Sequence, residues 1–340
     1  MRHERLGAVR AMDVAVGAGL LLGLGLLAAV LIGRGPAGAG GAGGGSAETA
    51  AEAENTPAEP VAAPTETVEA VLGSVQVFVR QGETDRARTV LAGAVEQFPG
   101  DQSLRLAFGD LLVSVGEAEA AYEQFEAALA IGPRTPAVEF TAGTLAQMSG
   151  SLDRAHEHFA AAQSGAPTNP SYAARLGQVQ VARGEVDAGK AMLAIARTQD
   201  PDLAVAWGQL AEIALRENKA ELALDYIEEA RRVEPESVAW RVIEARAKKR
   251  LGNPEGAVAV LVGLVDSDSV GEARGVVLRT LAESYGLLGQ PEEAAAAYAA
   301  AAAVEPTRAE WAQQAAAWFE RAGDEEEAEA WGQRAGMLGG

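Results

Sequence analysis

Cysteine is absent from the 340-residue sequence. This absence excludes disulfide bonds, thiolate metal sites, a cysteine nucleophile, covalent haem attachment and a lipid-modified N-terminal cysteine. Aromatic residues make up only 5% of the chain, and strand-like runs of alternating β-branched residues are scarce. With 39 glycines and abundant alanine, the composition instead suits helices that pack closely together. We therefore predict an all-α fold.

Positive charge is also in short supply. The chain has 28 Lys or Arg residues against 48 Asp or Glu residues, which gives a formal net charge of -20. A surface this acidic repels the phosphates of nucleic acids and anionic lipids. We therefore predict no nucleic-acid binding.

Charged residues are missing from one long segment near the N-terminus. Residues 14–33 read VAVGAGLLLGLGLLAAVLIG, without a charge or a strong polar group. As a helix this segment would be about 30 Å long, which matches the hydrocarbon thickness of a bilayer. Because Arg2, Arg5 and Arg10 precede it, the positive-inside rule places residues 1–13 in the cytoplasm. We predict a single-pass signal anchor in the inner (cytoplasmic) membrane and a periplasmic or otherwise extracytoplasmic C-terminal domain.

Two details of the N-terminal region leave alternatives open. The small residues Ala37 to Ala39 offer a signal-peptidase site, so a cleaved export signal is the competing interpretation. Ala15, Gly19 and Gly23 recur at four-residue spacing, and such a smooth helix face permits an anchor-mediated dimer.

The segment that follows, residues 34–67, consists mainly of Gly, Ala, Pro, Glu, Thr and Ser. A composition of this kind buries too little apolar surface to offset the entropy of the chain. It therefore predicts a flexible, disordered linker in front of a folded domain at residues 68–340.

The folded domain repeats itself. A glycine, or in one case asparagine, recurs every 34 residues with a single step of 37, a period typical of helical-hairpin repeats. Gly and Asn are also the residues that most readily adopt the left-handed conformation between two helices. These predicted turn residues are Gly82, Gly116, Gly150, Gly184, Asn218, Gly252, Gly289 and Gly323.

Other residue types keep a fixed distance from each turn. Small residues lie five positions after it and seven before it, which allows the two helices of a hairpin to cross closely. A bulky apolar residue lies nine positions after most turns, as at Leu91, Phe125, Phe159, Leu193, Ile227, Leu261 and Tyr298. A proline seventeen positions after most turns stops the second helix, at Pro99, Pro133, Pro167, Pro201, Pro235 and Pro306.

This pattern resembles the tetratricopeptide repeat (TPR), whose signature sets Trp, Leu, Gly or Ala, Tyr, Ala, Phe, Ala and Pro at fixed places in 34 residues. The fifth repeat shows it in Trp207, Leu210 and Ala211. The resemblance covers residues 68–340 and implies a right-handed α-solenoid of about eight TPR-like hairpins. The sixth repeat departs from the pattern, with Ser269 at the proline place and three extra residues. The eighth has Gly332 at the bulky place, which suits a solvent-facing cap.

Catalytic chemistry is not indicated. His156 and His158 flank Glu157, but at two-residue spacing their side chains diverge on a helix, so we expect solvated polar residues and no metal site. No serine elbow, phosphate-binding loop or zinc-protease helix is present. We predict that the protein is not an enzyme and has no cofactor.

What the resemblance implies is a binding surface. In this family the first helix of each hairpin lines a groove, chiefly through places 2, 5, 9, 12 and 13 of the repeat. Seven Lys or Arg residues against three Glu lie between Arg231 and Arg250, so part of this groove could bind an acidic segment. The alternative is a solvated face paired with nearby carboxylates, as Glu244 with Lys248. The candidate partner-binding residues are Phe140, Thr144, Gln147, Gln178, Arg216, Arg246, Lys249, Arg250 and Arg279.

We therefore predict a membrane-tethered interaction scaffold, similar to bacterial membrane-anchored TPR proteins, with proteins or peptides as partners. The extracytoplasmic groove would recruit partners for envelope assembly, secretion or cytochrome maturation. Two alternatives stay open: a periplasmic chaperone or delivery factor that binds unfolded segments, and an accessory subunit of an enzyme complex.

Overall fold

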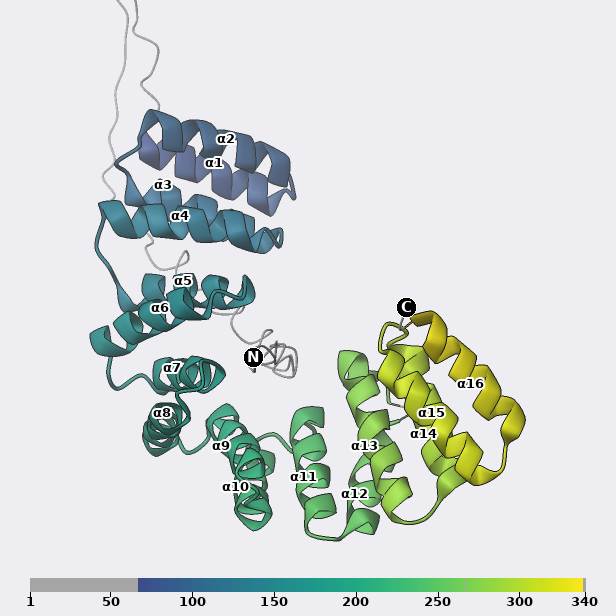
Figure 1. Cartoon of the computed structure of the whole chain (residues 1–340). Coiled ribbons are helices and arrows are strands. Elements are labelled where there is room, and N and C mark those ends of the chain that lie inside the picture. The colour runs from purple at the N-terminus through teal and green to yellow at the C-terminus, as the bar shows by residue number, and fades with distance from the viewer. Residues whose placement is uncertain (1–66, 266, 339–340) are drawn as a thin grey trace, which may run out of the picture. The chain divides into compact units, whose positions relative to one another are not determined.

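A computed structural model describes residues 67–265 and 267–338 of the chain. Within these residues the chain forms sixteen α-helices and two short 3₁₀ segments, with no strand, so the all-α prediction is confirmed for this part (Figure 1). The predicted anchor at 14–33 and the linker before Thr67 lie outside the described residues. No helix in the described part is long and apolar enough to cross a membrane.

The first compact unit ends at Arg134 and contains two helical hairpins. Each helix contacts the next one along the chain, and α1 also contacts α3. The helices are α1 (Val68–Arg80), α2 (Thr84–Gln97), α3 (Gln102–Ser114) and α4 (Ala118–Ile131).

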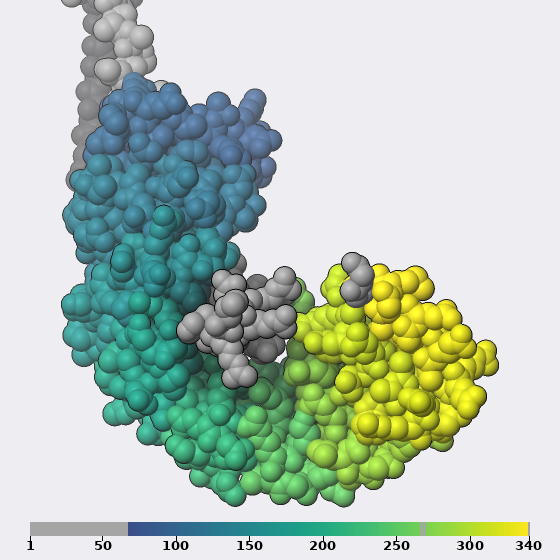
Figure 2. Space-filling model, viewed as in Figure 1, coloured from purple at the N-terminus to yellow at the C-terminus, as the bar shows by residue number. Residues whose placement is uncertain are grey.

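The second compact unit begins at Thr135 and contains six further hairpins, stacked in chain order. Its first three hairpins are α5 (Pro136–Met148) with α6 (Leu152–Gly165), α7 (Pro170–Ala182) with α8 (Val186–Gln199), and α9 (Ala204–Arg216) with α10 (Ala220–Val233). Its last three are α11 (Val238–Arg250) with α12 (Pro254–Leu261), α13 (Arg274–Leu287) with α14 (Pro291–Val304), and α15 (Ala309–Ala322) with α16 (Glu325–Leu338). In a space-filling view the atoms of α11 to α16 form one continuous surface, from green to yellow (Figure 2).

The turn residues behave as the 34-residue register predicts. All eight have positive φ angles, from 59° at Asn218 to 87° at Gly184. Asn218 is the one non-glycine residue with positive φ in the described part of the chain. Since glycine and asparagine adopt this conformation at low cost, the repeat in the sequence is a repeat of backbone geometry.

The helix ends also follow the predicted signals. The prolines at 99, 133, 167, 201, 235 and 306 each lie two residues beyond the end of a second helix. Several first helices begin at a side-chain cap, as where Thr67 accepts a hydrogen bond from the amide of Ala70 and Asp101 from that of Leu104. These caps satisfy amides that have no partner inside the helix.

Within each unit, the core lies between the two helices of a hairpin and between consecutive hairpins. At the crossing of α7 and α8, a Cβ added to Gly177 would lie 2.9 Å from the carbonyl oxygen of Gly189. In this hairpin the small residues before and after the turn therefore do meet, and they let the backbones approach. The bulky residues nine positions after the turns fill the adjacent space, and Phe159 and Leu193 are fully buried.

The sixth hairpin departs from the others, as its irregular sequence predicts. Its second helix, α12, has 8 residues, whereas the second helices of the other hairpins have 14. The chain continues as 3₁₀ segments at Val262–Leu264 and Asp268–Ala273, and Gly271 adopts φ 48° inside the second. The missing proline and the three extra residues thus replace the end of one helix by a less regular connection.

Candidate interaction surface

Three consecutive first helices, α9, α11 and α13, contact one another in turn and carry a line of charged side chains. Glu212, Arg246 and Glu283 occupy place 9 of the repeat, six residues before each turn residue. Arg246 on α11 pairs with Glu212 on α9 through two hydrogen bonds of 2.7 and 3.2 Å. On its other side, Lys249 of α11 pairs with Glu283 of α13. One helix is therefore tied to both neighbouring first helices by charge.

Three more cations lie along the same line. Arg216 is 3.6 Å from Glu212 and Arg279 is 3.9 Å from Glu283, each within its own helix. Arg250 donates to the backbone carbonyl of Leu215, next to the last residue of α9. A cation at this end of a helix is favourable because the carbonyls there carry partial negative charge.

We call these seven residues the basic strip: Glu212, Arg216, Arg246, Lys249, Arg250, Arg279 and Glu283. Five cations share two carboxylates, so the strip has a net charge of +3 in a chain of net charge -20. The buried Nε of Arg279 has no hydrogen-bond partner among the described residues. With three more cations than carboxylates, the strip retains positive charge that its own carboxylates do not neutralise.

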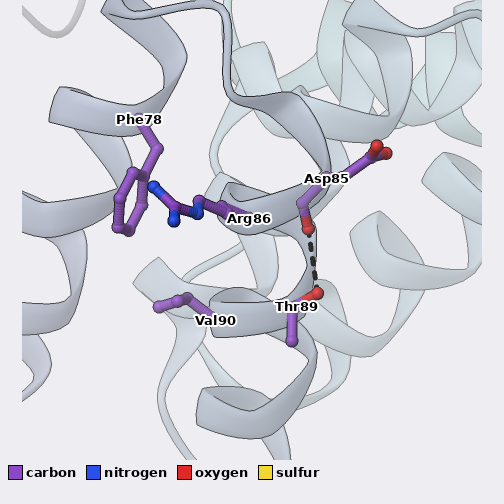
Figure 3. A pocket seen from close by; sticks show the side chains of 5 residues that line it. All are labelled: Phe78, Asp85, Arg86, Thr89 and Val90. Carbon is purple, nitrogen blue, oxygen red and sulfur yellow. Dashed lines mark hydrogen bonds between the residues drawn. The ribbon is translucent and has the colours of Figure 1, made fainter.

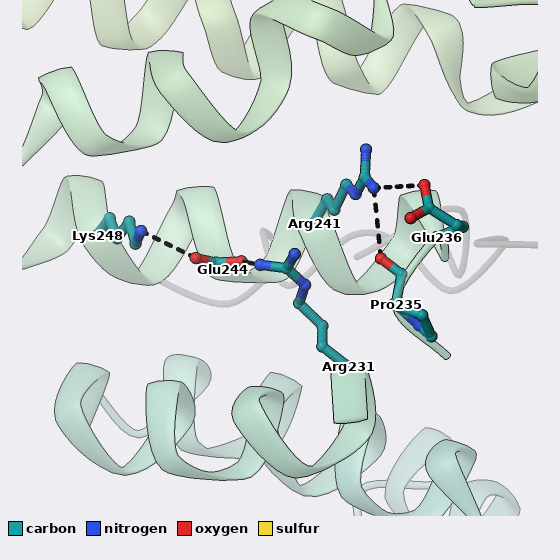
Figure 4. A network of polar contacts seen from close by, with 6 residues as sticks. All are labelled: Arg231, Pro235, Glu236, Arg241, Glu244 and Lys248. Carbon is teal, nitrogen blue, oxygen red and sulfur yellow. Dashed lines mark hydrogen bonds and ion pairs between the residues drawn. The ribbon is translucent and has the colours of Figure 1, made fainter. Parts of the chain in front are cut away.

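The opposite side of α11 carries a separate network, shown in Figure 4. There Glu244, 9% exposed, accepts from Lys248 at 2.9 Å and from Arg231 of α10. Arg241 pairs with Glu236 at 2.6 Å near the start of the helix (Figure 4). Each of these carboxylates is matched by at least one cation, so this network joins α10 to α11 and leaves little charge for a ligand.

The run of cations between Arg231 and Arg250 is therefore divided between two faces of the molecule. Both interpretations of the sequence describe part of it, since Glu244 does pair with Lys248 and the strip does carry excess positive charge. The sequence did not predict that Glu212 and Glu283, both at place 9, form ion pairs with Arg246 and Lys249. Their alternation with Arg246 at repeat spacing is the sequence signal that could have revealed the pairing.

The other candidate residues lie on hairpins three and four and form an uncharged face. The ring of Phe140 lies 5.4 Å from that of Phe159 and 4.9 Å from that of Tyr172, measured between centroids. Thr144 donates its hydroxyl to the carbonyl of Phe140 at 2.9 Å. Gln178 accepts from Arg175 at 3.2 Å, and Gln147 is half-buried. The contacts described for these residues all stay within hairpins three and four, separate from those of the basic strip on hairpins five to seven.

One prediction about the histidines is wrong. His158 is not solvated but 5% exposed, and its Nδ1 lies 2.8 Å from an Oε of Glu139, which is 2% exposed. Gly143 allows α6 to approach α5 there, since a Cβ at that position would lie 3.1 Å from the Cβ of His158. Sequence spacing within α6 could not show this partner on another helix. His156 stays half-buried and points elsewhere, and no group of three or more potential metal ligands is found among the described residues.

A shallow hollow of about 390 Å³ lies on the first hairpin between α1 and α2 (Figure 3). The Arg86 guanidinium lies 5.9 Å from the centre of the Phe78 ring, and Thr89 donates to the backbone carbonyl of Asp85. Val90 completes a mostly apolar lining. Because its polar groups do not converge, this hollow offers no constellation for catalysis.

These observations define the class as a helical-hairpin repeat protein with a charged first-helix surface. Two tetratricopeptide-repeat family models match residues 78–139 and 174–237, so the chain contains tetratricopeptide repeats. A search of curated proteins finds no match.

Solved structures show the same fold at low sequence identity. A tetratricopeptide repeat protein from Parabacteroides merdae ATCC 43184 aligns with a TM-score of 0.56 and 17% identity, over 70% of this chain and 93% of that one. The APC/C hetero-tetramer Cut9-Hcn1 aligns with a TM-score of 0.58 and 14% identity. That alignment covers 76% of this chain and 50% of the matched chain. PilW, a type IV pilus biogenesis factor, aligns with a TM-score of 0.51 and 19% identity. That alignment covers 62% of this chain and 97% of the PilW chain.

Proposed function

We propose that the protein is a membrane-tethered scaffold that recruits partner proteins through its first helices, without catalysing a reaction. The repeat architecture supports interaction as its task, because each hairpin presents a first helix whose outer residues are free to vary while the core is kept. The uncharged, uninterrupted segment at 14–33 supports the tether and an extracytoplasmic domain. Confinement near a membrane would raise the local concentration of the surface toward partners in that membrane.

The observation that carries the proposal is the basic strip. A net charge of +3 over seven side chains that lie on three adjacent helices is a specific feature of this acidic protein. Guanidinium groups bind carboxylates through paired hydrogen bonds, so the partner we propose is an extended segment rich in Asp and Glu. Envelope assembly, secretion and cytochrome maturation are the processes in which such recruitment would serve.

The test neutralises the excess charge while keeping the two ion pairs that join neighbouring first helices. Changing Arg216, Arg250 and Arg279 together to Gln brings the strip to zero net charge but leaves Arg246 with Glu212 and Lys249 with Glu283. Crosslinking in intact membranes should then lose the partners that the wild-type chain captures. The matched control changes Arg86, Arg88 and Arg232 to Gln, which removes the same charge outside the strip and should leave capture unchanged.

The same experiment separates the alternatives. One stoichiometric partner, lost with the strip, supports the scaffold. Many weakly bound extended chains would instead indicate a chaperone or delivery factor, and co-purification of an enzyme would indicate an accessory subunit. Equal capture by the wild-type chain and the strip variant would contradict the basic strip as a binding surface.

A further inference from the structure

A second row of residues crosses the same three first helices one turn beyond place 9. These residues occupy place 13, two residues before each turn residue: Arg216 on α9, Arg250 on α11 and Leu287 on α13. We call them the place-13 row. Residues four apart on a helix share a face, so this row lies beside the place-9 residues of the basic strip. All three residues of the row are exposed.

The two rows differ in what they contact within the molecule. The place-9 residues take part in the ion pairs that join neighbouring first helices. None of the described ion pairs joins Arg216 or Arg250 to another helix. Arg250 donates to the backbone carbonyl of Leu215, which holds it beside the end of α9 that carries Arg216. Leu287, 62% exposed, is the most exposed leucine in the described part of the chain, so the row presents two cations and one apolar side chain to solvent.

The spacing of the row favours one conformation of a bound segment. Packed helices lie about 8–10 Å apart, and α9, α11 and α13 contact one another in turn. In a polyproline II helix three residues advance about 9 Å and return to the same face, whereas in a β-strand residues three apart point to opposite faces. The described residues contain no strand whose ladder a bound segment would extend. A polyproline II segment therefore presents one side chain to each hairpin.

We infer that the place-13 row binds a partner segment in the polyproline II conformation. Two carboxylates of the segment, three residues apart, lie over Arg216 and Arg250. An apolar side chain three residues further along packs on Leu287. The inference rests on the proposed function, because it specifies which acidic segment the basic strip takes. It adds an order and a spacing that attraction by net charge does not require.

The probe is a fluorescein-labelled peptide of Pro and Ala in which Leu, Glu, Glu and Leu stand three residues apart. This symmetric order offers a leucine to Leu287 whichever way the peptide runs, and the prolines hold the polyproline II conformation. A matched peptide has the same composition, but its Leu and Glu residues stand two apart and fall on different faces. Fluorescence anisotropy with the full-length chain should show about tenfold weaker binding of the matched peptide, the effect of losing one charged hydrogen bond.

Three substitutions test the apolar end of the row. Leu287→Ser should weaken binding of the three-spaced peptide about tenfold, the lower end of what burial of a leucine side chain contributes. Leu222→Ser, at a leucine of α10 that is 37% exposed, is the matched control and should leave binding unchanged. Leu287→Arg continues the arginines of the row, and it should shift the preference to a peptide that has a third Glu in place of the apolar residue. Circular dichroism confirms that each variant stays helical.

The charge-neutral strip variant, with Arg216, Arg250 and Arg279 changed to Gln, separates this inference from the proposed function. If the wild-type chain binds both peptides equally and the strip variant loses both, the strip attracts acidic chains by charge alone and the inference is wrong. Failure of the three-spaced peptide to bind, or its undiminished binding to Leu287→Ser, would also contradict the inference. If the strip variant binds both peptides as tightly as the wild-type chain does, the proposed function itself fails.

Discussion

Hairpins three and four differ from hairpins five to seven at the same place of the repeat. At place 9 the former carry Thr144 and Gln178, and the latter carry Glu212, Arg246 and Glu283. The uncharged residues bond within their own helices, while the charged ones reach across to the neighbouring hairpin. One backbone pattern therefore supports two kinds of surface, one shaped by aromatic packing and one by charge.

The difference shows how a repeat separates folding from recognition. Turn residues, small crossing residues and bulky core residues recur in both regions, so the hairpins fold alike. Place 9 contributes little to that core and is free to change.

The largest effect is expected from Phe159→Ala in hairpin three. Phe159 is fully buried and its ring fills the space beside Gly143, so the truncation leaves a cavity and should cost about 3–5 kcal/mol of stability. Urea unfolding followed by circular dichroism measures it. Phe140→Ala, at a half-buried ring, is the matched control and should cost clearly less. A similar loss for both variants would mean that Phe140 belongs to the core and is not available to a partner.

Asp110 also occupies place 9, and none of the described cations forms an ion pair with it. It lies on α3 of the first unit, its Oδ1 has no hydrogen-bond partner among the described residues, and burial raises its pKa to about 6 from 3.8. A raised pKa means that the folded state favours the protonated carboxyl. This contribution is fully present below pH 3.8 and is lost as the pH rises through about 6.

Asp110→Asn should therefore stabilise the protein at pH 7, by at most about 3 kcal/mol, because two pKa units correspond to that free energy. The advantage over the wild-type chain should shrink as the pH falls from 7 and should vanish below about pH 4. Urea midpoints of both chains across this range measure the difference. A constant difference at all pH values would show that the carboxyl does not titrate with folding.

The sequence predicted the fold well because its main signals are local. Turn geometry depends on one residue, as at Asn218, and helix ends depend on a proline or a cap near them. The irregular sixth hairpin was also predicted, because its sequence lacks the proline and has three residues more than the 34-residue period. The matching of Arg246 with Glu212 was not, since it depends on which residues meet across a 34-residue interval. The burial of His158 against Glu139 was missed because it also depends on a contact between two helices.

The smallest effect is the coupling energy between Arg246 and Glu212. It measures directly how much a charged pair at place 9 contributes to stability. Both side chains are partly shielded, with 29% and 21% exposed, and they form two hydrogen bonds between hairpins. A double-mutant cycle with Arg246→Met and Glu212→Gln should give a coupling of about 1 kcal/mol that decreases with salt. Arg232 of α10 and Asp202 of the loop before α9 also pair at 2.7 Å but are more exposed, so their cycle should show no coupling beyond experimental error. Equal coupling in the two cycles would mean that burial at place 9 adds nothing to the pair, and that the charged face of hairpins five to seven is held no more firmly than an ordinary surface.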